Sequence, residues 1–182
     1  MQIDDLELAF ANTGRLVSGV RADQWTADTP CTDWNVRALA NHTTWVVAMF
    51  ADVVQGRPPT AARDADLLGD DPAAAFAGTT RATLDAWRAR GFEGTVTFGP
   101  GELPAVSAFA INLFDTYVHG WDIAQATGQD AELDPALCAV LLDVLPGLAS
   151  VVRRGDNFGP EVDVAPDAPV ADRMLAYLGR KG

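Results

Sequence analysis

The spacing of apolar residues is the feature that most constrains this chain. Apolar side chains recur at intervals of three and four residues along most of its length, and proline or glycine ends each run. This period is typical of one buried face of an α-helix. The runs predict helices over residues 3–21, 35–55, 71–90, 104–127 and from 134 onwards. Pro146 lies inside the last run and should kink or shorten that helix.

Two segments interrupt the helical period. Residues 57–70 form a polar loop, and residues 92–103 carry Thr95–Phe98 between glycines, which predicts a short extended or hairpin insert. The helices and the long loop together favour an all-α bundle of four or five helices with at least one crossover connection. We expect a bundle domain over residues 1–152 and a proline-containing C-terminal tail over 153–182 that packs on it.

The charge balance excludes several classes of partner. Thirteen basic residues stand against 25 acidic ones, so the formal net charge is −12, and Lys181 is the single lysine. This balance disfavours nucleic acid and anionic membrane surfaces, because phosphate binding needs clustered cations. No stretch approaches the ~18 apolar residues of a membrane span, and the N-terminus does not resemble a signal peptide. Cys31 and Cys138 are far apart, so we expect a reducing, cytoplasmic location and no disulfide.

The chain has only two histidines, and both fall within predicted helices. His119 follows Asp115 by four residues, so both side chains share one helix face and can hold one ion. His42 lies on the apolar face of the second helix and would meet that pair if the two helices pack together. Two nitrogens and one oxygen leave positions for water or substrate. They suit Zn²⁺ first, with Ni²⁺ or Fe²⁺ as alternatives, and suit Ca²⁺ poorly.

Other polar residues near these motifs have competing interpretations. Asn112, one turn before Asp115, could hold its carboxylate or a bound water as an outer partner. Asp122 could serve as a second outer partner or in proton transfer, or it could cap its helix or pair with an arginine such as Arg37. Cys31 is interpreted as a small packing residue in a turn, with a reactive thiol as the alternative. Nearby tryptophans are interpreted as packing residues rather than stacking platforms: Trp25, Trp34 and Trp121.

Three stretches carry a resemblance to a known family. They are WTADTPCTDWNVRALANHTTWVVAMF, DTYVHGWDIAQATG and FGPEVDVAPDAPVADRMLAYLGR. Together they resemble the actinobacterial metal-binding domain family named for mycothiol-dependent maleylpyruvate isomerase, within the DinB-like superfamily. The likeness covers essentially the whole chain. The first two stretches are the signatures of the family, and the second of them, with its acid-x-x-x-His pattern, is the more specific.

The resemblance implies a DinB-like four-helix bundle with up-down-down-up topology and a divalent metal held by His42, Asp115 and His119. It also implies a low-molecular-weight thiol of the mycothiol type as cofactor, kept as thiolate by the metal. The isomerase usually has glutamate where this chain has Asp115, and it carries a separate C-terminal domain. We therefore expect this chain to be a shorter member of the family, and we do not assign it the substrate of the isomerase.

Three functional hypotheses follow. The first is a metal-dependent thiol transferase or isomerase, in which a metal-bound thiol or water attacks a small electrophilic substrate. The second is a non-enzymatic helical bundle that binds a metal or a ligand. The third is a structural bundle whose two histidines are hydrogen-bonded core residues. A monomer and a homodimer are both compatible with the apolar content.

Overall fold

The computed structural model describes residues 1–152 and 158–181 of the chain. It divides into two compact units, Met1–Ala131 and Glu132–Gly182. The division therefore precedes the last helical run, whereas our prediction placed it at residue 152. That the C-terminal part packs on the bundle stays a prediction.

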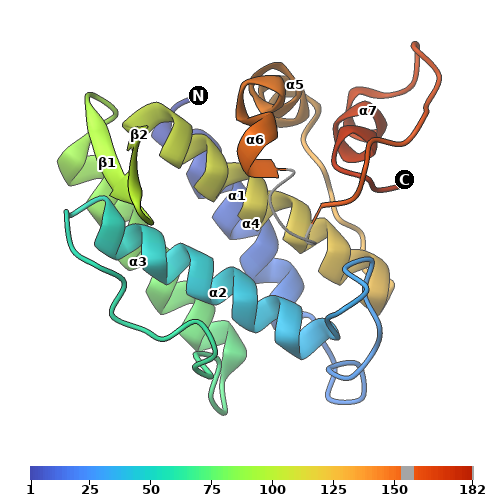
Figure 1. The fold of residues 1–182 in the computed structure, drawn as a ribbon. Coiled ribbons are helices and arrows are strands. Elements are labelled where there is room, and N and C mark those ends of the chain that lie inside the picture. The colour runs from blue at the N-terminus through green and yellow to red at the C-terminus, as the bar shows by residue number, and fades with distance from the viewer. Residues whose placement is uncertain (153–157, 182) are drawn as a thin grey trace. The chain divides into compact units, whose positions relative to one another are not determined.

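Four long helices build the first unit: α1 (Ile3–Ser18), α2 (Val36–Val53), α3 (Pro72–Arg90) and α4 (Ala105–Thr127). Helices α3 and α4 each contact both α1 and α2. In Figure 1, α1 and α4 run in one direction and α2 and α3 in the other. Because α2 and α3 are neighbours with the same direction, the chain must cross the bundle between them, and residues 54–71 do so. The predicted up-down-down-up bundle is confirmed.

The helix starts follow the local chemistry of their first residues. The Asn35 side chain accepts a hydrogen bond from the Ala38 amide at 2.9 Å, and Asp71 accepts one from Ala74 at 3.0 Å. Each cap satisfies an amide that has no partner within its own helix. Helix α4 ends at Gly128, whose φ of 67° places it in the left-handed region.

A two-stranded hairpin joins α3 to α4. Strands β1 (Thr95–Phe98) and β2 (Gly101–Pro104) pair antiparallel, with Phe98 opposite Gly101. Phe98 also stacks on Phe50 of α2, with ring centroids 5.7 Å apart. The extended insert predicted between the glycines is therefore a hairpin whose last β1 residue touches the bundle.

Helix α4 is buried on nearly its whole circumference, as its apolar sequence predicted. Helices α4 and α1 come close together at Thr13, whose hydroxyl donates a hydrogen bond to the Thr116 carbonyl at 3.0 Å. A Cβ atom at Gly120 would lie 2.5 Å from the Thr13 Oγ1 atom, so only glycine fits there. This contact explains the glycine that follows His119 in the sequence.

The second unit is smaller and also helical. It contains α5 (Pro135–Val144), the 3₁₀ turn η1 (Leu145–Leu148), α6 (Ala149–Val152) and α7 (Val170–Tyr177). Helix α5 stops at the turn that holds Pro146, as predicted. Helices α5 and α7 pack together around a set of fully buried apolar residues: Cys138, Leu141, Leu145, Met174 and Leu178.

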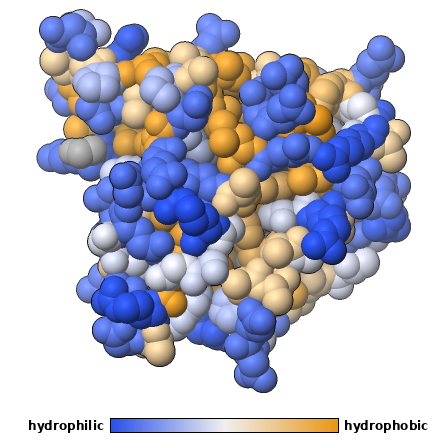
Figure 2. Space-filling view, turned by 180° about the vertical axis from the view of Figure 1, so that it is seen from behind, coloured by the Kyte–Doolittle hydropathy of each residue, from blue (hydrophilic) through white to orange (hydrophobic). Residues whose placement is uncertain are grey.

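Hydrophilic residues cover much of the face shown in Figure 2, in keeping with the large net charge. Among the described residues, no helix is both long enough and apolar enough to cross a bilayer. Both cysteines are buried, and neither forms a disulfide within the described part of the chain.

Candidate metal centre

Helices α2 and α4 bring the three predicted ligands together inside the bundle. One oxygen of Asp115, Oδ1, lies 3.9 Å from Nε2 of His42 and 3.6 Å from Nε2 of His119. One ligand atom from each residue can be chosen so that all three lie within 4.8 Å of one another. Residues separated by more than 70 positions in the chain thus converge on one point.

The donor set and its spacing fit a divalent cation. Two ligands at about 2.1 Å from a tetrahedral Zn²⁺ are roughly 3.4 Å apart, close to the two measured separations. The Nε2 atom of His42 is buried and has no hydrogen-bond partner among the described residues. A buried polar nitrogen without a partner is costly, and a metal ion would satisfy it. These three residues could therefore hold a cation.

The far side of His119 is fixed by a second carboxylate. Its Nδ1 lies 3.0 Å from Oδ2 of Asp122, and both side chains are fully buried. Such a carboxylate–histidine pair fixes the ring and leaves Nε2 to face Asp115. Burial alone would lower the pKa of His119, but the charge on Asp115 and the hydrogen bond to Asp122 raise it to about 10. The surroundings thus favour positive charge at this imidazole, whether a proton or a metal ion supplies it.

Cys31 belongs to the same cluster. Its thiol donates to Oδ2 of Asp122 at 3.3 Å, and its sulfur lies 3.7 Å from Nδ1 of His119. Cys31, His119 and Asp122 form a second group that could hold a metal, and all three are buried. The interpretation of Cys31 as a packing residue in a turn missed these contacts, because its partners lie 88 and 91 residues further along the chain.

A folded turn before α2 carries Cys31 to this position. The Thr29 hydroxyl donates to the carbonyls of Cys31 and Trp34, and it accepts from the Cys31 amide. The amides of Val36 and Arg37 at the start of α2 bond back to residues before the turn. The turn is therefore tied to the helix that holds His42, and this fixes the position of the Cys31 thiol relative to the His42 imidazole.

The site opens to solvent at His42. A pocket of about 480 Å³ is lined by Trp34, Ala38, Asn41, His42, Arg63 and Asp64. The Trp34 ring lies against the His42 ring, with centroids 4.3 Å apart and an interplanar angle of 33°. Trp34 is thus half-buried beside the opening and packs against His42. A small molecule entering this pocket would meet His42.

Two predicted neighbours have other partners. The side-chain amide oxygen of Asn112, Oδ1, accepts a hydrogen bond from the Trp87 indole at 3.1 Å, which ties α4 to α3. The role of Asn112 as an outer partner of Asp115 stays a prediction. Arg37, considered as a partner for Asp122, instead pairs with Asp66 at 2.8 Å.

Sequence comparison finds a family model and two relatives. Residues 6–124 match the model of the mycothiol maleylpyruvate isomerase N-terminal domain. Two uncharacterized proteins of Mycobacterium tuberculosis, from strains CDC 1551 / Oshkosh and ATCC 25618 / H37Rv, are each 31% identical over 168 residues. These alignments cover 91% of this chain and 90% of each relative.

Solved structures share the fold. The crystal structure of the mycothiol-dependent maleylpyruvate isomerase matches with a TM-score of 0.63 at 13% identity, covering 79% of this chain and 67% of that one. A mutant of that isomerase, with alanine in place of a histidine, matches with a TM-score of 0.62 at 11% identity over the same shares. At such low identity, the likeness establishes the helical architecture.

Proposed function

The chain belongs to the mycothiol maleylpyruvate isomerase N-terminal domain family, and from this premise we propose that it is a metal-dependent thiol transferase or isomerase. His42, Asp115 and His119 hold a divalent cation, with Zn²⁺ favoured by the donor set. A low-molecular-weight thiol of the mycothiol type serves as the cofactor, and the substrate is a small electrophile.

One observation carries this proposal. Two imidazoles and a carboxylate from two neighbouring helices point at one another, and the exposed end of the cluster meets a pocket large enough for a small molecule. A structural core histidine would instead have a hydrogen-bond partner for each buried nitrogen, and Nε2 of His42 has none among the described residues.

The residues around the centre have distinct tasks in the proposed reaction. A bound divalent ion supplies positive charge that keeps a coordinated thiol as thiolate near neutral pH. Asp122 accepts a hydrogen bond from Nδ1 of His119 and so keeps Nε2 of that ring directed at Asp115 and His42. We call His42, Asp115 and His119 the ligand cluster. Trp34 packs against the His42 ring at the opening and so limits the orientations that this imidazole can adopt.

The pocket at His42 gives the acceptor its place. Arg63 and Asp64 lie at its exposed side, so a polar acceptor would meet one group of each charge. Electrophiles that carry a carboxylate would be oriented by Arg63, with the reactive carbon turned towards His42. His42, Asp115 and His119 would hold the ion that keeps the thiol deprotonated, and attack of the thiolate sulfur on that carbon would form a carbon–sulfur bond while the electrophile's π electrons shift to its acceptor oxygen.

Elemental analysis with matched variants tests the metal centre. Asp115→Asn keeps the side-chain shape but removes the charge, and Asp85→Asn makes the same change on the exposed face of α3. We expect about one divalent ion per chain in the wild type and in Asp85→Asn, and a loss of most of it in Asp115→Asn. Equal, sub-stoichiometric metal in all three proteins would contradict the proposal.

Turnover measurements separate catalysis from binding. The metal-loaded protein is incubated with mycothiol or a simpler thiol and with a panel of small electrophiles, and thiol consumption is followed with Asp85→Asn as control. We expect acceleration that depends on both metal and thiol. Stoichiometric metal without acceleration for any electrophile would favour the alternative of a metal-binding bundle that is not an enzyme.

A further inference from the structure

A second pocket lies away from the candidate metal centre. It has a volume of about 540 Å³, and we call it the hairpin pocket. It is lined by residues of α2, of the turn that follows α2 and of the β1–β2 hairpin: Trp45, Met49, Val53, Gly56, Arg57, Pro58, Pro59, Thr97, Phe98 and Gly99. Its size falls in the range of sites for small molecules, roughly 300–1,000 Å³.

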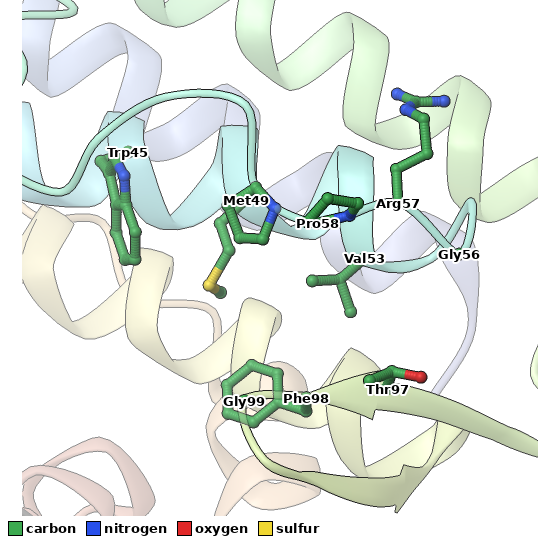
Figure 3. A pocket seen from close by; sticks show the side chains of 10 residues that line it. Trp45, Met49, Val53, Gly56, Arg57, Pro58, Thr97, Phe98 and Gly99 are labelled. Atoms are coloured by element: carbon green, nitrogen blue, oxygen red, sulfur yellow. The ribbon is translucent and has the colours of Figure 1, made fainter.

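The walls of the hairpin pocket are apolar. Figure 3 shows Met49 and Val53 pointing from α2 towards the hairpin, where Phe98 faces them. Met49 and Phe98 are half-buried, so both present apolar surface to the cavity. A thioether beside an aromatic ring adapts well to flat ligands, and such contacts are favourable.

The pocket offers no unpaired charge to a ligand. The Arg57 guanidinium donates to a carboxylate oxygen of Asp52 at 2.7 Å and to Gln55. In Figure 3 it points away from the space between α2 and the hairpin. Arg63, which lies against the Trp45 ring at 5.9 Å, lines the pocket at His42 instead. The lining therefore suits an uncharged molecule.

The pocket is held open by contacts that need no ligand. The Trp45 indole donates to the Ala61 carbonyl at 3.1 Å, and Phe98 stacks on Phe50. Asp52 accepts from the amide and the hydroxyl of Thr60, which ties down the chain beyond Pro58 and Pro59. A ligand would thus find walls already formed, and little ordering would oppose its binding.

We propose that the hairpin pocket binds an uncharged, mainly aromatic small molecule, independently of the metal centre. The ligand's ring lies between Met49 of α2 and Phe98 of the hairpin, with Trp45 at one end of the pocket. This site would give the protein a third small-molecule partner, besides the thiol and the electrophile of the proposed function.

Two related fluorescent probes test the proposal on the full-length chain. N-phenylnaphthylamine is uncharged, and anilinonaphthalene sulfonate has the same ring systems with a negative charge. We expect saturable one-to-one binding of the uncharged probe, and binding of the sulfonate weaker by about tenfold, because a charge in an apolar pocket is costly. Equal affinity for the two probes would overturn the proposal, as would no saturable binding.

Variants place the binding site. Met49→Glu puts a charge into the pocket and should weaken the uncharged probe by about tenfold or more. Leu8→Glu makes a comparable change on the exposed face of α1 and should leave affinity within about twofold. Circular dichroism establishes that both variants are folded. If Met49→Glu loses its helical signal, Phe98→Ala replaces it, with the same expected loss of affinity. Unchanged affinity in the folded variant contradicts the assignment.

Chelation separates this proposal from that of the metal centre. Removing bound metal should leave the affinity for the uncharged probe unchanged, because no lining residue belongs to the ligand cluster. A loss of probe binding on chelation would overturn the independence of the two sites. A protein that binds no metal but retains the probe site would contradict the proposed function alone.

Discussion

Two regions of helix α2 lie on one stripe and have opposite chemistry. His42, Trp45, Met49 and Val53 follow each other at intervals of three and four residues, so one face of the helix carries them all. At His42 the neighbours are a carboxylate, a second imidazole and polar groups of the loop. Further along, at Met49 and Val53, the neighbours are an aromatic ring and prolines.

The difference comes from what faces the helix, since the helix itself is continuous. Helix α4 supplies Asp115 and His119 against the first part of the stripe, whereas the hairpin supplies Phe98 against the second. Charged and polar groups surround the first region, whereas apolar side chains surround the second. Changes in one region should therefore leave the other intact, and the predictions below test this separation.

The largest effect is expected from His42→Ala. The variant removes one of the three proposed ligands, so the protein should lose bound metal and at least about 100-fold of any thiol-dependent activity. Its affinity for the uncharged probe should stay within about twofold of the wild type, because the hairpin pocket does not include His42. Metal analysis, turnover and a fluorescence titration check this. Loss of probe binding would show that the two regions are coupled.

Asp122→Asn should have the next largest effect. The amide of the variant carries no negative charge with which to accept the hydrogen bond from Nδ1 of His119. Loss of such an outer partner typically lowers metal affinity by about 10–100-fold. We expect the variant to keep its folded structure. A metal titration against a competing chelator measures it, with Asp85→Asn as control. Metal affinity equal to that of the control would contradict the role given to Asp122.

Asp52→Asn should affect the hairpin pocket and spare the metal centre. Burial alone would raise the pKa of Asp52, but hydrogen bonds from Thr60 and Arg57 lower it below its ordinary value. We expect the variant to bind the uncharged probe several-fold more weakly, with unchanged metal content. Fluorescence and metal analysis measure the two quantities.

The pH dependence of stability gives a second readout for Asp52. A carboxyl group with a lowered pKa stabilises the folded state above its unfolded pKa, about 3.9, and this contribution is lost as the pH falls through the folded pKa. The wild type should therefore be more stable than Asp52→Asn at neutral pH, and the difference should shrink below about pH 4. A difference in free energy of unfolding that is constant over this range would contradict the account.

The smallest effect is expected from Cys31. Cys31→Ala removes the thiol that donates to Asp122, which acts on the metal only through His119, so metal affinity should fall by only a few-fold. Cys31→Ser keeps a donor and should recover part of the loss. The same chelator titration measures both variants. A larger loss with serine than with alanine would contradict the hydrogen-bonding role.

The bundle and the convergence of His42, Asp115 and His119 could be predicted from the sequence for separate reasons, and their role as metal ligands stays a prediction. Proline, glycine and capping residues such as Asn35 and Asp71 mark the helix ends, and the apolar period marks the buried faces. The two histidines are the only ones in the chain, and the spacing of Asp115 and His119 already places them on one helix face.

Contacts of Cys31 and the hairpin pocket could not be predicted in this way. Cys31 reaches Asp122 across the fold, and no local pattern records a contact over 91 residues. Met49 and Val53 are apolar residues at helical spacing and Phe98 is an apolar residue of a short extended segment, and both patterns favour a core interpretation equally well. Whether such residues face a cavity or a neighbour depends on the path of the loop and the hairpin, which periodicity does not determine.

The hairpin between α3 and α4 is a two-stranded unit that joins two helices of the bundle. Its strands satisfy each other's backbone hydrogen bonds, and its turn at Gly99 lies beyond the helices that position His42 and His119. Insertions or deletions there would move Phe98 while the ligand cluster stays in place. A change in the hairpin could thus alter what the hairpin pocket recognises while the candidate metal centre keeps its geometry.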